Sequence, residues 1–239
     1  MSTITGKSIV DRASLLLQDV TNVRWGTTSD LLLWLNDGQR EVVLLKPEAC
    51  VSSAAILLTA NATKQNIVTA SSPKAIMLID IVRNMGAAGT TDGDGIRLSS
   101  REILDAGIPN WHSATNTAGK IVHYVFDPRN PKTFYVFPKA PSSAWYVEAV
   151  FSSSPTDTDY ASAVIGVDDI YANALLDYVM YRAYSKDADY AQNAQLAAAH
   201  YQAFVNSLGV AQSTAQARNP NILGGLTGNP NVPSATRQQ

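Results

Sequence analysis

Apolar residues recur at helical spacing near the start of the chain and again towards its end. The pattern predicts a first helix over residues 5–20 and a second from a cap at Thr27, Thr28 or Ser29 to Lys46, where Pro47 ends it. Together they form a predicted helical hairpin. The second helix is expected to bury its apolar stripe, which consists of Leu31, Leu35, Gly38, Val42 and Leu45.

Helical spacing disappears after residue 50, where short β-like runs alternate with clusters of Ser, Thr, Gly, Asn and Pro. A short helical turn is expected over residues 100–106. The last three β-like runs are joined by short Pro-rich turns, which predicts a three-stranded antiparallel meander. The predicted strands are 54–59, 65–69, 75–82, 96–99, 120–126, 132–137 and 144–151.

Helical spacing returns in the region 160–209. Asp168 is expected to cap one helix, and another begins near residues 187–189 and stops at Gly209. Each hairpin leaves an apolar stripe that needs a partner, so the two are predicted to pack as one four-helix bundle. The predicted fold is α+β, with a helical bundle from residues 1–50 and 160–209 and an inserted antiparallel β domain over 51–159.

The remaining residues, 210–239, are rich in Asn, Gln, Gly, Pro, Ser and Thr, and their only charges are Arg218 and Arg237. Such a segment buries too little apolar surface to fold alone. It is either a loose terminus or an extended C-terminal arm that becomes ordered on a neighbouring protein. In the second case the expected anchors are Ile222, Leu223, Leu226 and Val232.

Composition favours a protein whose surface meets other proteins. Of the 239 residues 46% are hydrophobic and only 16% are charged, and the net charge is −2. No overall basic field therefore draws the chain to nucleic acid or to an anionic membrane. The single cysteine, Cys50, excludes an intrachain disulfide. The N-terminal residues lack a secretory pattern, and no apolar run is long enough to span a bilayer.

The search for chemistry predicts no catalytic residue, no metal site and no cofactor. Gly6-Lys7-Ser8 lacks the earlier glycine of a phosphate-binding loop. If Asp92-Gly93-Asp94-Gly95 belonged to a calcium loop, the bidentate position would fall on Arg101, so a solvated turn is favoured. The histidines at 112, 123 and 200 lack metal-ligand spacing. The aromatic residues at 124–137 are interpreted as sheet core rather than as a stacking surface for nucleic acid.

The order of several short motifs resembles a family of podophage head-to-tail adaptor (connector) proteins, also compared with tail tubular and head-completion proteins. The resemblance covers about residues 5–208. It is carried by the stretches 34–41, 46–47, 83–84, 104–111, 123–124 and 127–138. The motif residues, interpreted as structural, are Trp34, Asn36, Gly38, Pro47, Asn84, Trp111, Asp127, Pro131, Phe134 and Pro138.

The resemblance implies a ring of twelve subunits in the neck or tail of a virion assembled in the host cytoplasm. The helical part would face the portal protein, and the β part would face the tail nozzle or tail-fibre proteins. DNA would pass through the lumen only in transit, during retention and ejection, and no membrane or cofactor would be involved.

Two other classes of function remain open from the sequence. One is a carbohydrate- or receptor-binding β module of a phage tail, which predicts exposed aromatic side chains and monomers or trimers rather than rings. The other is a hydrolase, which needs carboxylates converging in a cleft. Glu102 and Asp105 are candidates for such a pair, although both fit equally well on the solvated face of a helix.

Overall fold

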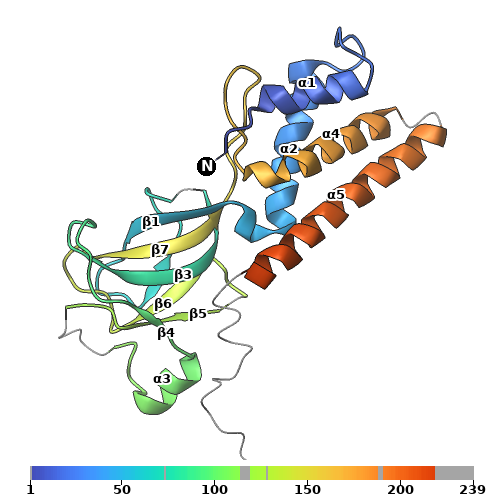
Figure 1. The fold of residues 1–239 in the computed structure, drawn as a ribbon. Helices are drawn as coiled ribbons and strands as arrows, with labels where there is room; N and C mark the ends of the chain where they lie inside the picture. Colours follow the sequence, from blue (N-terminus) through green and yellow to red (C-terminus); the bar gives the residue numbers. More distant parts are fainter. Residues whose placement is uncertain (1, 73, 114–118, 128, 188–190, 219–239) are drawn as a thin grey trace, which may run out of the picture. The chain divides into compact units, whose positions relative to one another are not determined.

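The fold is mixed α+β and divides into two compact units (Figure 1). The computed structural model describes residues 2–72, 74–113, 119–127, 129–187 and 191–218. One unit, the helical unit, combines 1–39 with the residues from 158 onward. The other, the β unit, comprises residues 40–157. The last residues of α2 (Leu32–Leu45) therefore group with the strands rather than with the other helices.

The helical unit is built around α4 (Ala172–Lys186). α5 (Ala191–Arg218) lies beside it and runs antiparallel to it, whereas α2 runs across it (Figure 1). α1 (Gly6–Leu16) also packs on α4, and its N-terminus is capped by Thr5 Oγ1, which accepts from the Ser8 amide at 3.3 Å. α1, α4, α5 and the first part of α2 thus lie in one unit. Its buried side chains include Ile9, Val10, Ala13, Trp25, Leu31, Leu35, Leu175, Val179 and Phe204.

Three details of the predicted helices are wrong. No Thr27, Thr28 or Ser29 side chain caps α2; a π-helical turn, η1 (Thr27–Leu31), leads into it instead, and Asp30 accepts from the Gly26 amide. Leu45 is 48% exposed, because Val42 and Val43 are the side chains of the last turn that point inward. α5 continues through Gly209 to Arg218, since one glycine costs a helix only about 1 kcal/mol.

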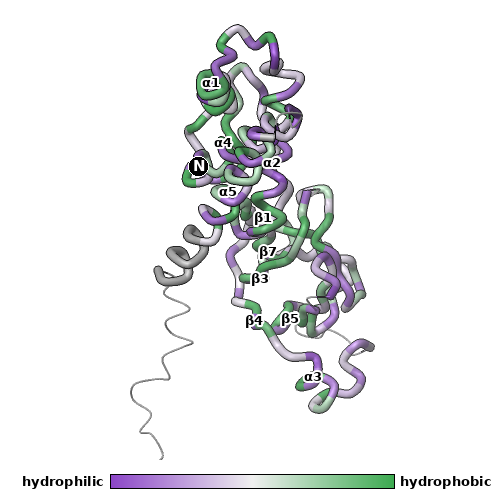
Figure 2. The backbone as a smooth tube through the Cα atoms, turned by 90° about the vertical axis from the view of Figure 1, so that its right-hand side faces the viewer, coloured by the Kyte–Doolittle hydropathy of each residue, from purple (hydrophilic) through white to green (hydrophobic). Residues whose placement is uncertain are grey.

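The β unit contains two sheets that share one core. The first sheet has the order β1-β7-β3 and is antiparallel throughout, with β1 (Val51–Leu57), β7 (Tyr146–Ser153) and β3 (Ala75–Gly86). Figure 2 colours much of these three strands as apolar. The second sheet has the order β2-β6-β5-β4, with β2 (Lys64–Asn66), β6 (Thr133–Phe137), β5 (His123–Phe126) and β4 (Arg97–Leu98). The shared core includes Ile56, Leu78, Ile81, Phe134, Val136, Val147 and Phe151.

The predicted meander is wrong in its last strand. β5 and β6 do pair as an antiparallel hairpin, but β7 lies in the other sheet between β1 and β3. β4 pairs with β5 in parallel, so the inserted domain is not antiparallel throughout. Two short helical segments complete the unit: η2 (Pro47–Ala49) and α3 (Arg101–Gly107), the helical turn that the sequence predicts, with Ser100 as its cap.

β3 does not follow the two-residue alternation of a regular strand. Its register against β7 shifts after every second pair, so that its buried positions fall three residues apart, at Ala75, Leu78, Ile81 and Asn84. Each shift leaves one extra residue without a partner across the ladder, as a β-bulge does. These extra residues are Ile76, Ile79, Val82 and Met85.

Candidate functional site

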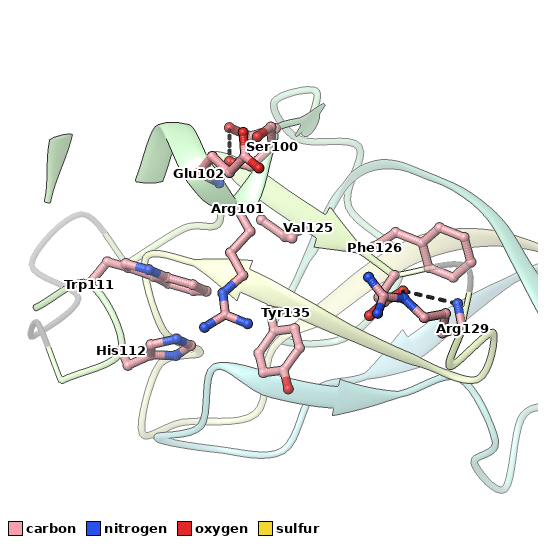
Figure 3. Close-up of a pocket in the computed structure, with 11 residues that line it drawn as sticks. Ser100, Arg101, Glu102, Trp111, His112, Val125, Phe126, Arg129 and Tyr135 are labelled. Carbon is pink, nitrogen blue, oxygen red and sulfur yellow. Dashed lines mark hydrogen bonds and ion pairs between the residues drawn. The ribbon is translucent and has the colours of Figure 1, made fainter. Parts of the chain in front are cut away.

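A hollow with a volume of about 560 Å³ lies beside α3 in the β unit (Figure 3). Its walls come from the start of α3, the 111–112 turn, the end of β5 and the middle of β6. Aromatic rings and charged groups both face it. The lining residues are Ser99, Ser100, Arg101, Glu102, Trp111, His112, Val125, Phe126, Asp127, Arg129 and Tyr135.

Asp105 on α3 fixes one side of this hollow. Its carboxylate accepts a hydrogen bond from Trp111 Nε1 at 2.8 Å and pairs with Arg101 Nε at 3.2 Å. The indole hydrogen bond, followed by the Arg101 charge, holds the pKa of Asp105 below its ordinary value. An ionised carboxylate with both oxygens engaged is a poor general acid. Asp105 therefore positions its neighbours and gives no support to the hydrolase interpretation.

The rings beside Asp105 form a small second core under α3. Trp111 is 1% exposed and stacks on His112, with ring centroids 3.7 Å apart. Tyr135 and Phe137 meet the indole edge-on at 6.3 and 6.4 Å. Leu104, Val125 and Ile108 complete this cluster. The hollow is thus lined by rings that are already held in place without a ligand.

Asn84 ties together three segments of the β unit. Its amide nitrogen donates to the carbonyl oxygens of Asp94 and Ile121, at 3.0 and 2.8 Å. Its amide oxygen accepts from the Ile121 backbone and from Trp145 Nε1, both at 2.9 Å. Asn84 is only 3% exposed, so each of these four bonds satisfies a group that little water can reach.

The acidic turn after β3 is held by ion pairs within the protein. Arg83 pairs with Glu148 at 2.6 Å and with Asp92 at 3.1 Å, and Lys120 pairs with Asp94. These contacts, the Glu148 hydrogen bond first, raise the pKa of Arg83. Within the described part of the chain, no group of three or more His, Cys, Asp or Glu side chains is arranged to hold a metal ion.

In the helical unit, Asn36 and Gln39 fasten α2 to the segment that precedes α4. Asn36 exchanges two hydrogen bonds with the backbone of Thr158, at 2.9 and 3.2 Å. Gln39 donates to Asn36 Oδ1 and accepts from the Gly166 amide at 2.6 Å.

Gly38 lies between Asn36 and Gln39 in the sequence, and a Cβ added to it would sit 2.9 Å from the Tyr178 ring. The glycine is therefore required by the close approach of α4.

Asp169 fastens the N-terminal residues to the start of α4. Its carboxylate accepts from Ser2 Oγ, from Thr3 N and Oγ1, and from Ile4 N, at 2.6–3.1 Å. These hydrogen bonds, that of Ser2 first, hold the pKa of Asp169 well below its ordinary value. The predicted cap Asp168 occupies the N-cap position of the η3 turn (Asp169–Tyr171), but its side chain makes no capping bond there.

Several large apolar side chains of the helical unit are exposed. The end of α1 and the turn after it contain Leu15, Leu16, Val20 and Val23, which are 68%, 55%, 67% and 85% exposed. We call residues 15–23 the apolar turn. Burying such side chains is favourable by roughly 1.5–3 kcal/mol each, so their exposure marks a surface suited to contact with another protein.

The remaining motif residues occupy structural positions. Lys186 lies over the Trp34 ring at 5.7 Å, and the Pro131 carbonyl accepts from the Leu78 amide at 2.9 Å. Phe134 is fully buried, Asp127 accepts from the Arg129 amide, and a cis peptide bond precedes Pro138. Pro47 begins η2. The predicted anchors Ile222, Leu223, Leu226 and Val232 lie outside the described residues.

Sequence reasoning did not find the hollow beside α3. The aromatic residues at 124–137 were interpreted as sheet core, which is confirmed for Tyr124 and Phe134 but is incomplete for Tyr135, which also lines the hollow. The available signal was the spacing of Arg101 and Asp105, four residues apart on a capped helical turn, followed by a Trp-His pair.

Comparison with models of protein families shows to which family the chain belongs. The family model of the SU10 adaptor protein matches residues 4–224, nearly the whole chain. The chain belongs to the SU10 adaptor family. This membership implies a structural component of a phage particle, in contact with other virion proteins, rather than a catalyst. A search of curated proteins finds no match. Among the described helices of this SU10 adaptor protein, none combines the length and apolar character needed to cross a membrane.

Proposed function

We propose that this SU10 adaptor protein forms a ring of twelve subunits that joins the portal to the tail nozzle. DNA is retained behind this ring after packaging and passes through its lumen on ejection. The family match over residues 4–224 carries the proposal. The low content of charged residues, 16%, supports it, because much of the surface would be buried between proteins.

We assign the portal contact to the helical unit and the tail contact to the β unit. The apolar turn supports the first assignment, since it presents exposed apolar side chains such as Val23 (85% exposed) that a partner would cover. A net charge of −2 suits a lumen through which DNA slides, because strong phosphate neutralisation would hold the DNA in place.

The alternative of a carbohydrate- or receptor-binding β module predicts exposed aromatic side chains in the β unit. Phe134 is fully buried, and Tyr124 and Trp111 are 4% and 1% exposed. Burial of these three rings counts against that alternative, whereas Phe126 and Tyr135 are half-buried and line the hollow beside α3.

Electron microscopy of the purified protein, alone and mixed with purified portal rings, tests the proposal. We expect monomers alone and a second ring stacked on the portal in the mixture. A protein that leaves the portal unchanged and stays monomeric in the mixture contradicts the ring adaptor.

The C-terminal arm is proposed to anchor the protein on the portal or on an adjacent subunit. Since α5 extends to Arg218, the proposed arm is reduced to the residues after it, with Ile222, Leu223, Leu226 and Val232 as anchors. Truncation after Arg218 should leave circular dichroism and thermal unfolding unchanged and abolish stable attachment to portal rings. Unchanged attachment of the truncated protein would exclude the arm as the anchor.

A further inference from the structure

The hollow beside α3 presents two arginine side chains whose terminal amino groups are available to a ligand. Asp105 pairs with Nε of Arg101, and the rest of that guanidinium extends between the rings of His112 and Tyr135 (Figure 3). On the other side, Asp127 pairs with Nε of Arg129 at 3.4 Å. Because a guanidinium carries five N–H donors, each arginine retains donors for an incoming anion.

The surface between the two arginines is apolar and aromatic. Tyr135, Val125 and Phe126 line it, and Trp111 and His112 close one end. The rings are fixed by packing, so they lose little conformational freedom when a ligand binds, whereas the Arg101 and Arg129 side chains, 72% and 93% exposed, become ordered on binding. A volume of about 560 Å³ accommodates a few side chains of an extended segment.

We propose that this hollow binds an acidic peptide segment of another protein, with carboxylates on Arg101 and Arg129 and an apolar or aromatic side chain between them. Guanidinium groups bind carboxylates in a planar, two-point geometry that favours this class of ligand. Glu102 and Asp127 also line the hollow. Their charges disfavour a continuous run of phosphates along the hollow, whereas the proposed peptide places its carboxylates only at its two ends, beside Arg101 and Arg129.

The inference rests on the proposed function only in that another virion protein would supply the segment. The hollow lies entirely within the β unit, so binding is expected from the isolated protein without any ring. A failure of peptide binding and a failure of ring assembly are therefore separate results.

The experiment uses fluorescence anisotropy with the labelled peptide Ac-Asp-Glu-Tyr-Asp-Glu-NH₂ and the full-length protein. The matched probe Ac-Asn-Gln-Tyr-Asn-Gln-NH₂ keeps the shape and removes the charges, and a short oligothymidylate represents nucleic acid. We expect saturable binding of the acidic peptide that weakens with added salt, and at least about tenfold weaker binding of the amide peptide.

The double variant Arg101→Gln/Arg129→Gln should reduce the affinity for the acidic peptide by about tenfold or more. Arg97→Gln is the matched control, because Arg97 is exposed on β4 of the same sheet and does not line the hollow. Circular dichroism of all three proteins should coincide, since each substituted side chain is exposed. Equal binding by the double variant and the wild type overturns the proposal. Tighter binding of oligothymidylate that is lost in the double variant also overturns it, in favour of a nucleic-acid site.

Discussion

The two units of this SU10 adaptor protein differ in how their exposed large apolar side chains are distributed. The β unit closes a core between two sheets, in which Phe134, Ile56 and Val147 are fully buried. The helical unit leaves large side chains such as Leu15 and Val23 in water. Hydrogen bonds of Asp169 and Asn36 help to join its chain-distant segments. Both units therefore retain apolar surface for a partner. In the helical unit four such side chains gather in the apolar turn, whereas in the β unit Leu44, Leu98 and Ile103 (74%, 65% and 67% exposed) lie on three separate elements.

The largest effect is expected from cavities in the two cores. Phe134→Ala should destabilise the β unit by about 3–5 kcal/mol, because a fully buried ring is removed. Phe204→Ala removes an equally buried ring from the helical unit and is the matched variant. Hydrogen exchange resolved along the chain should show faster exchange mainly in the mutated unit. If either variant speeded hydrogen exchange equally in both units, the two units would unfold as one cooperative structure.

A smaller loss is expected when the Asn84 network is removed. Asn84→Ala leaves buried groups at Ile121 and Trp145 without their partner, so the free energy of unfolding should fall by about 3 kcal/mol in urea titrations. Asn66→Ala on β2 removes only one exposed hydrogen bond, from the Val68 amide to Asn66 Oδ1, and should change the free energy of unfolding by no more than about 1 kcal/mol. Equal losses in the two variants would show that the buried network adds nothing to the β unit.

Asp169 provides a pH-dependent test of the helical unit. Its pKa is below its ordinary value of 3.8 in the folded protein, so the unfolded chain binds more protons just below that pH. The stability that it contributes is present above this pH and is lost as the pH falls towards the lower, folded pKa. Asp169→Asn should flatten the acid limb of the stability curve and speed amide exchange at Thr3 and Ile4. Asp168→Asn is the control and should behave as the wild type. An unchanged acid limb in Asp169→Asn would show that Asp169 does not hold the N-terminal residues in place.

The smallest effect on stability should accompany a large effect on assembly. Leu15→Ser/Val23→Ser should change the free energy of unfolding by no more than about 0.5 kcal/mol, since both side chains are exposed. Attachment to portal rings should nevertheless weaken if the apolar turn meets the portal. Ile103→Ser on α3 removes a side chain that is 67% exposed in the β unit and serves as the control. Portal attachment that survives the double substitution would place the contact elsewhere.

The sequence predicted the positions of the helices and strands better than it predicted which strands pair with each other. Ser100 and the turn around Pro131 are local signals, and the structure places α3 and the β5-β6 hairpin where these signals indicate. The place of β7 is not a local property, because its partners β1 and β3 lie far away in the chain. The sequence prediction also missed the three-residue spacing of the buried positions on β3, because β-bulges take Ile76 and Ile79 out of the expected two-residue alternation.

The candidate site was harder to predict than the fold, because it too depends on contacts between residues that are far apart in the sequence. Arg101 and Asp105 are neighbours on one helical turn, but Tyr135 and Arg129 reach the hollow only through the pairing of β5 with β6. The absence of a catalytic motif was visible in the sequence, whereas a surface that binds by shape and charge has no fixed spacing.

The helical unit is assembled from both halves of the chain, and this has a consequence for the order of events on the ribosome. Residues 40–157 of the β unit are synthesised before Asp169 exists, so this unit can fold while the polypeptide is still growing. Residues 2–4 must wait for the Asp169 carboxylate, and α2 must wait for Thr158. The helices around the apolar turn can therefore reach their folded arrangement only after most of the chain has been synthesised.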